Sequence, residues 1–292
     1  MVIITEEEIH KNRLVNAYFD DGGSKSLLPV IKLTEPMTYK PWEFIPLKRV
    51  VIRGTDLFGS RGDTMKSIVA EIANSGSIQN WLGFDGEVVL SSIMPDIMLR
   101  GISKESYAYI INKLEFDYYF TPDGETYIGE EHLGRYEVGR ILKETEFLLD
   151  ECKGGKPIGL VKGSTEGQIK TDVKALVCLG IKDMVVHVGD FIRRGDEREI
   201  AAGMRAAKIA RSQARELLIY GVGARQNIDY FGFGDSFITQ SHFVNAFYRQ
   251  KLNNGKWEFM KRKAERADVM NNLKEIYNEV IGLEKRGGKL SA

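Results

Sequence analysis

The sequence predicts an α/β fold, a (β/α)8 TIM-type barrel with extra helices at its termini and no zinc subdomain. Three apolar or β-branched runs, at 157–164, 183–190 and 217–223, each end in glycine or polar residues, as buried parallel strands do. Helical patterns separate these runs, and the length of 292 residues is close to the ~250 of a typical barrel. The same alternation also fits a doubly wound open sheet. We favour the barrel because no G-x-G-x-x-G follows the first strand.

The remaining elements can be assigned in order along the chain. Thr5 and Glu8 have the spacing of a capping box, so a first helix should begin near residue 6. Residues 20–48 contain several prolines, which predicts a loop-rich region with one short strand. Further strands are expected at 48–52, 87–90 and 116–120, and helices at 64–74, 104–114, 131–150, 165–179, 196–216 and 258–286. These elements give about six or seven βα units in a single domain, 1–292, with 1–47 as N-terminal decoration, 48–250 as barrel core and 251–292 as a C-terminal helical segment.

The composition limits the classes of function. Lys+Arg and Asp+Glu number 41 each, which argues against a broad, purely electrostatic binder but leaves room for a local basic patch. Cys152 and Cys178 are too few for a disulfide framework, and the four histidines do not easily complete a zinc site with them. We therefore expect no metal, no cofactor and a reducing, cytoplasmic compartment. The N-terminus lacks a signal-peptide pattern, and no apolar run approaches the ~20 residues of a membrane span.

Two aspartates stand where a barrel would place chemistry. Asp235 follows a run in which aromatic residues alternate with glycine, so we expect it at a strand end. A carboxylate there can be a nucleophile, a general base or a metal ligand. Asp123 directly follows the aromatic strand at 116–120. Both also have a simpler explanation, because Asp-Ser is good N-cap chemistry and Thr-Pro-Asp-Gly is a good turn.

Other candidate binding residues follow the predicted strands. Lys162, Gly163 and Ser164 can hold an anion or a base edge, since glycine permits close approach and a helix start follows; a simple turn fits equally well. His187 lies in an apolar run, where a core histidine is the commoner case. Basic residues that could contact phosphates are Arg193, Arg194, Lys261, Arg262 and Lys263, although a charged run is often only a solvated face.

In order and spacing, these segments resemble the tRNA-guanine transglycosylase superfamily over residues 84–245. The family's Gly-Ile-Val-Gln-Gly-Gly strand resembles Gly-Leu-Val-Lys-Gly-Ser at 159–164, and its Leu-Met-Gly-Val-Gly strand resembles Leu-Ile-Tyr-Gly-Val-Gly at 218–223. A family strand ending in Gly-Gly is similar to Val-Val-His-Val-Gly-Asp at 185–190. Upstream, the family's Trp-Asp-Gly-Pro-Ile-Leu-Thr-Asp-Ser-Gly resembles Phe-Asp-Gly-Glu-Val-Val-Leu-Ser-Ser at 84–92, and its Phe-Asp-Glu segment is similar to Thr-Pro-Asp at 121–123.

The resemblance implies a base exchange in which a 7-deazaguanine base replaces guanine through a covalent intermediate between an aspartate and the sugar. Asp235 would be the nucleophile, and Asp123 would accept hydrogen bonds from the guanine N1–H and exocyclic amine. The family's base-binding Gln matches Lys162, and its proton-transfer Asp matches Ser91, with Asp96 nearby as an alternative. The implied substrate-binding set is Asp123, Lys162, Gly163, His187, Gly189, Gly221 and Gly223.

The departures from the family pattern favour its divergent members that insert 7-deazaguanine into DNA. They are the changes at Ser91 and Lys162 and the missing Cys/His zinc cluster. The expected partners are DNA, with tRNA as the alternative, and a 7-deazaguanine base, without a membrane and with a homodimer left open. Three other functions stay open: a tRNA-modifying glycosyltransferase, a non-catalytic nucleic-acid-binding paralogue, and a barrel enzyme acting on a small phosphorylated metabolite. Asp123 and Asp235 argue against the paralogue.

Overall fold

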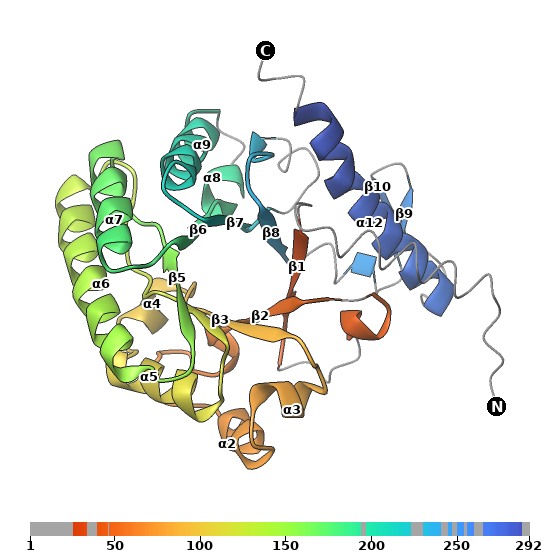
Figure 1. The fold of residues 1–292 in the computed structure, drawn as a ribbon, viewed down its shortest axis with the longest axis horizontal. Coiled ribbons are helices and arrows are strands. Elements are labelled where there is room, and N and C mark those ends of the chain that lie inside the picture. Colours follow the sequence, from red (N-terminus) through yellow and green to blue (C-terminus); the bar gives the residue numbers. More distant parts are fainter. Residues whose placement is uncertain are drawn as a thin grey trace.

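The computed structural model describes residues 26–33, 40–45, 47–193, 197–222, 230–240, 245–246, 250–253, 256–259 and 265–287. Eight parallel strands close into a barrel, in which each strand is hydrogen-bonded to the next and the last is paired with the first (Figure 1). In chain order they are β1 (Ser26–Ile31), β2 (Arg49–Arg53), β3 (Glu87–Ser91), β4 (Tyr118–Phe120), β5 (Lys156–Leu160), β6 (Asp183–His187), β7 (Glu216–Tyr220) and β8 (Ser236–Thr239). This closed ring of parallel strands confirms the predicted (β/α)8 barrel.

Helices cover the outside of the barrel (Figure 1). Those described are α2 (Ser67–Asn74), α3 (Ile78–Leu82), α4 (Asp96–Leu99), α5 (Lys104–Lys113), α6 (Glu131–Glu151), α7 (Glu166–Cys178), α8 (Gly189–Arg193), α9 (Glu197–Arg211) and α12 (Arg266–Gly287). Two of them start as the sequence predicts, because Ser103 caps α5 and Thr165 caps α7 by accepting a backbone N–H three residues on. The helix ends therefore follow local capping chemistry, whereas their docking follows the apolar stripe of each helix.

Apolar side chains form two layers, because alternate residues of each strand point to opposite sides. The inner cluster fills the barrel with Leu28, Val30, Val51, Val89, Phe120, Ile158, Leu160, Val185, Leu218 and Ile238. The outer cluster lies between strands and helices, and it includes Ile52, Leu90, Tyr119 and Phe237. The lumen is therefore a packed core, and polar chemistry is confined to the two ends of the barrel.

Arg49 closes the amino end of the lumen. Its guanidinium donates to Glu87 at 3.0 Å and to Glu216 at 3.2 Å, and it lies 4.4 Å from the centre of the Tyr118 ring. Burial by itself lowers the pKa of Arg49, but Glu216 and Glu87 raise it above its ordinary value. A cation matched in this way supports the stability of this end of the barrel.

Two of the predicted boundaries are wrong. The barrel begins with β1 at Ser26, inside the segment 1–47 that was expected to be decoration. The segment 251–292 is not purely helical, because an antiparallel hairpin of β9 (Gln250–Asn253) and β10 (Lys256–Phe259) precedes α12. The helix expected near residue 6 lies outside the described residues. Among the helices that the structure describes, none has the length and apolar character needed to cross a membrane.

Candidate functional site

Asp123 and Lys162 meet at the carboxyl end of the barrel. Asp123 follows β4 and Lys162 follows β5, so pairing of these two strands brings the side chains together. The Lys162 Nζ lies 2.7 Å from the Asp123 Oδ1, and the backbone N–H of Gly124 donates to the same oxygen at 2.7 Å. The Asp123 Oδ2 accepts no hydrogen bond from a described residue. One carboxylate oxygen is therefore anchored and the other remains available to a ligand.

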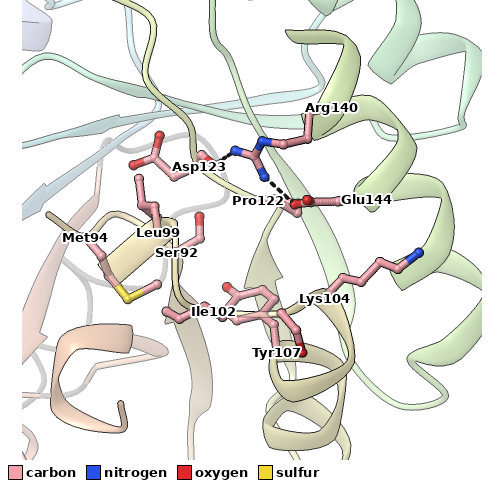
Figure 2. Close-up of a pocket in the computed structure, with 11 residues that line it drawn as sticks. Ser92, Met94, Leu99, Ile102, Lys104, Tyr107, Pro122, Asp123, Arg140 and Glu144 are labelled. Atoms are coloured by element: carbon pink, nitrogen blue, oxygen red, sulfur yellow. Dashed lines mark hydrogen bonds and ion pairs between the residues drawn. The ribbon is translucent and has the colours of Figure 1, made fainter. Parts of the chain in front are cut away.

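The loop that carries Asp123 is fastened to α6 by Arg140 (Figure 2). The Arg140 Nη2 donates to the Asp123 backbone oxygen at 2.9 Å, and the same guanidinium pairs with Glu137 at 2.8 Å and with Glu144 at 2.7 Å. Burial lowers the pKa of Arg140, but the hydrogen bonds to Glu137 and Glu144 raise it well above its ordinary value. Arg140 therefore stays charged and holds the Asp123 loop in one conformation.

A narrow cleft opens beside this loop, between α5 and α6 (Figure 2). Its empty volume of about 360 Å³ includes open solvent. The lining mixes apolar with polar and charged side chains, and it consists of Ser92, Met94, Leu99, Ile102, Ser103, Lys104, Tyr107, Pro122, Asp123, Arg140 and Glu144. In the view of Figure 2 the carboxylate of Asp123 points away from Arg140 and Glu144. The cleft thus borders the Asp123 loop.

The loop that carries Lys162 depends on glycine and on α7. Gly163 has a φ of +154°, and a Cβ there would lie 2.8 Å from the backbone nitrogen of Ile169. No larger residue fits at this position, so Gly163 serves the close approach of the loop to α7. The backbone N–H of Lys162 donates to Asp172 on α7 at 2.8 Å. This loop is an ordinary β–α turn whose backbone is held by α7.

Ser91 and Tyr220 are the last residues of β3 and β7, at the same end of the barrel as Asp123 and Lys162. The Ser91 hydroxyl accepts the backbone N–H of Ile93 at 3.2 Å, and burial raises the pKa of Tyr220. The Tyr220 ring contacts His187 edge-on at 5.4 Å between centroids and Phe120 at 6.2 Å. Ser91 has no exposed surface. The hydroxyl of this buried serine is therefore already engaged with the backbone of the loop that follows β3.

Glycines let the β6 and β7 ends approach each other beside His187. Gly221 has a φ of +90°, and a Cβ at this residue would lie 2.9 Å from the Cα of Gly189. A Cβ at Gly189 would lie 2.9 Å from the Nε2 of His187. The structure therefore brings together His187, Gly189 and Gly221, while Gly223 lies outside the described residues.

Sequence reasoning missed Arg53 and Asp56. Arg53 ends β2, and its Nη2 pairs with the Asp56 Oδ1 at 2.6 Å. The Asp56 Oδ2 accepts the backbone N–H of Leu33, which follows β1, at 3.1 Å. The Arg-Gly-Thr-Asp run directly after a strand was a usable signal. Because Asp56 is 2% exposed and its oxygens are engaged, we interpret it as a structural carboxylate.

Asp235 lies at the opposite end of the barrel, so the expectation that it marks a carboxyl strand end is wrong. β8 begins at Ser236, directly after Asp235, and its carboxyl end is Thr239. The Asp235 Oδ2 accepts the backbone N–H of Leu217 at 2.7 Å and pairs with Arg211. The aromatic and glycine run before Asp235 forms a turn, and the aspartate ties the start of β8 to the start of β7.

Of the remaining predicted residues, Asp96 and Arg193 belong to helices and the others lie outside the described part. Asp96 begins α4 and accepts a hydrogen bond from Tyr127. Arg193 belongs to α8, and Arg194, Lys261, Arg262 and Lys263 lie outside the described residues. Within the described ranges, no group of three or more His, Cys, Asp and Glu could hold a metal ion.

The comparisons with known proteins do not identify a family. No protein-family model matches the chain, and no curated protein matches it.

Proposed function

We propose that this barrel binds a guanine-type base, guanine or a 7-deazaguanine, at its carboxyl end, and that it does so as a nucleic-acid-binding protein without Asp235-dependent base exchange. The observation that carries the proposal is the pair of Asp123 and Lys162 at the end of two adjacent strands, 2.7 Å apart. Residues in this place are the ones that barrels use for ligands.

The pair of Asp123 and Lys162 complements the edge of guanine. That edge presents two donors, the N1–H and the exocyclic amine, next to one acceptor, O6. A carboxylate accepts from both donors, and an ammonium group donates to O6, so a base can replace part of the contact between Asp123 and Lys162 with bonds to itself. Asp123 is 7% exposed and the Lys162 side chain 16% exposed, so these bonds would form largely out of water, where they are stronger.

Covalent base exchange has weaker support than base binding. It needs a nucleophile beside the bound sugar, whereas Asp235 lies at the amino end and is engaged with Leu217 and Arg211. At the carboxyl end of the described strands, Asp56 is bound by Arg53 and the N–H of Leu33, and Asp123 is the proposed base acceptor. We therefore prefer the non-catalytic alternative to the glycosyltransferase. DNA stays the proposed nucleic acid, with tRNA as the alternative, and the base must leave its stack to enter.

The experiment is a calorimetric titration of guanine and a 7-deazaguanine into the wild type and Asp123→Asn. The amide cannot accept both donors, so we expect affinity to fall by about 2–4 kcal/mol, or about 30- to 700-fold. Asp117→Asn is the matched control, because Asp117 precedes the same strand at the other end of the barrel and accepts the Val88 N–H at 2.7 Å. Equal affinity in Asp123→Asn and Asp117→Asn, or no binding by the wild type, would overturn the proposal.

A second measurement addresses catalysis. After incubation with guanine-containing DNA or tRNA, we expect no adduct that resists denaturant. An adduct that disappears in Asp235→Asn would restore Asp235 as the nucleophile and return the protein to the transglycosylases.

A further inference from the structure

A fully buried carboxylate lies beneath the loop that presents Lys162. Asp172, on α7, has no exposed surface, and its Oδ2 accepts the backbone N–H of Lys162 at 2.8 Å. The Asp172 Oδ1 is buried and has no hydrogen-bond partner among the described residues. A buried carboxylate with one unsatisfied oxygen costs free energy, so its presence needs a reason beyond filling space.

The neighbouring residues of the loop have other anchors. The Ser164 N–H donates to the Gln168 Oε1 at 2.9 Å, and the Gln168 Nε2 donates in turn to the Glu131 backbone oxygen at 2.8 Å. Thr165 caps α7. The segment after Lys162 is therefore held by α6 and α7, while the backbone of Lys162 itself is held by Asp172.

We propose that Asp172 is a positioning residue that holds the Lys162 backbone so that the ammonium group of Lys162 faces Asp123 and the O6 edge of a bound base. This inference rests on the proposed base-binding function and assigns a residue that acts through Lys162 without touching the ligand.

Burial and Lys162 determine the electrostatic surroundings of Asp172. Burial raises the pKa of Asp172 to about 7, and the Lys162 N–H and the Lys162 charge act in the opposite direction. Lys162 is the one titratable group among the described residues whose charge contributes to this shift. Lys162 thus lies between two carboxylates, Asp123 in contact with its ammonium and Asp172 in contact with its backbone. When a base takes over the Asp123 oxygens, Asp172 keeps Lys162 in place.

The test compares guanine with 6-thioguanine, which keeps the N1–H and the amine but offers sulfur, a weak acceptor, in place of O6. Both are titrated into the wild type, Asp172→Ala, Asp172→Asn and Thr145→Val. Thr145 is the control, because it is fully buried and bonds the Ile141 backbone oxygen within α6. If Asp172→Ala does not fold, Asp172→Ser replaces it, since its hydroxyl is too short to reach the loop.

We expect Asp172→Ala to weaken guanine binding about 10-fold and to leave 6-thioguanine within about 2-fold, because only guanine uses the Lys162 bond fully. Asp172→Asn should retain the preference for guanine, since its amide oxygen still accepts the Lys162 N–H. An unchanged preference in Asp172→Ala, or the same loss of preference in Thr145→Val, would show a merely structural role and overturn the inference.

A ligand-free measurement separates this inference from the proposed function. Acetylation of Lys162 by a water-soluble succinimidyl ester is followed by peptide mass spectrometry, with the exposed Lys170 of α7 as reference. We expect Lys162 to react several-fold faster in Asp172→Ala than in the wild type or Asp172→Asn. If the wild type binds no guanine, the proposed function fails, and equal Lys162 rates in all variants would then also remove Asp172 as a positioning residue.

Discussion

Replacing Asp172 by Asn should change how the stability of the protein depends on pH. Burial raises the pKa of the folded-state carboxyl from 3.8 to about 7. Because the folded-state pKa is the higher one, Asp172 stabilises the fold fully below pH 3.8, and this contribution is lost as the pH rises through about 7. At about 1.4 kcal/mol per pKa unit, the full contribution is about 4 kcal/mol, of which about 3 kcal/mol is lost between about pH 5 and about pH 8.

The assay is urea unfolding of the wild type and Asp172→Asn at several pH values across this range. Asparagine has no charge to lose and can still accept the Lys162 N–H, so the variant should lack this part of the pH dependence. The difference in unfolding free energy should therefore move by about 3 kcal/mol in favour of the variant as the pH rises. Thr145→Val should show a constant offset. A difference between wild type and Asp172→Asn that does not change with pH would refute the argument, because the carboxyl would then be ionised in both the folded and the unfolded state across this range.

Three further predictions concern the two ends of the barrel. Asp235→Asn should leave guanine affinity within about 2-fold. It should lower the unfolding free energy by about 1–3 kcal/mol, because it weakens the contacts with Leu217 and Arg211. A selective loss of base affinity in calorimetry would contradict the position of Asp235 at the amino end of the barrel. Gly221→Ala should cost about 1–3 kcal/mol in urea unfolding, because its φ of +90° and its 2.9 Å approach to Gly189 exclude a side chain; a neutral effect would mean that the loop relaxes freely. Arg49→Met should lower the unfolding free energy by about 3 kcal/mol or more, because Glu87 and Glu216 lose their cation. A variant more stable than the wild type would show that apolar packing at this position outweighs the ion pairs.

The barrel and most helices could be predicted from the sequence, because strand runs, capping residues and glycine turns are local signals. The helix predicted at 165–179 matches α7 (Glu166–Cys178), and Thr165 caps it as the local pattern requires. The sequence does not predict β1 as a barrel strand. Pro29 stands in its middle, and a proline normally marks the edge of a sheet or the end of a strand. In the structure β1 pairs with β2 on one side and with β8 on the other, and these pairings form only when the barrel closes.

The candidate site was likewise predictable only in part. The sequence by itself determined that Asp123 and Lys162 each follow a strand. An apolar run that ends in polar or glycine residues is a local signal, and it can be recognised without knowing which other strands lie beside it. Only the tertiary structure decided which end of the barrel each aspartate occupies: Asp235 precedes its strand and Asp123 follows its own, although both stand next to aromatic and glycine residues. The contact of Lys162 with Asp123 and that of Arg49 with Glu216 join residues on or just after different strands that are far apart in the chain. Strand pairing and helix docking determine such contacts, and residue spacing carries no record of them.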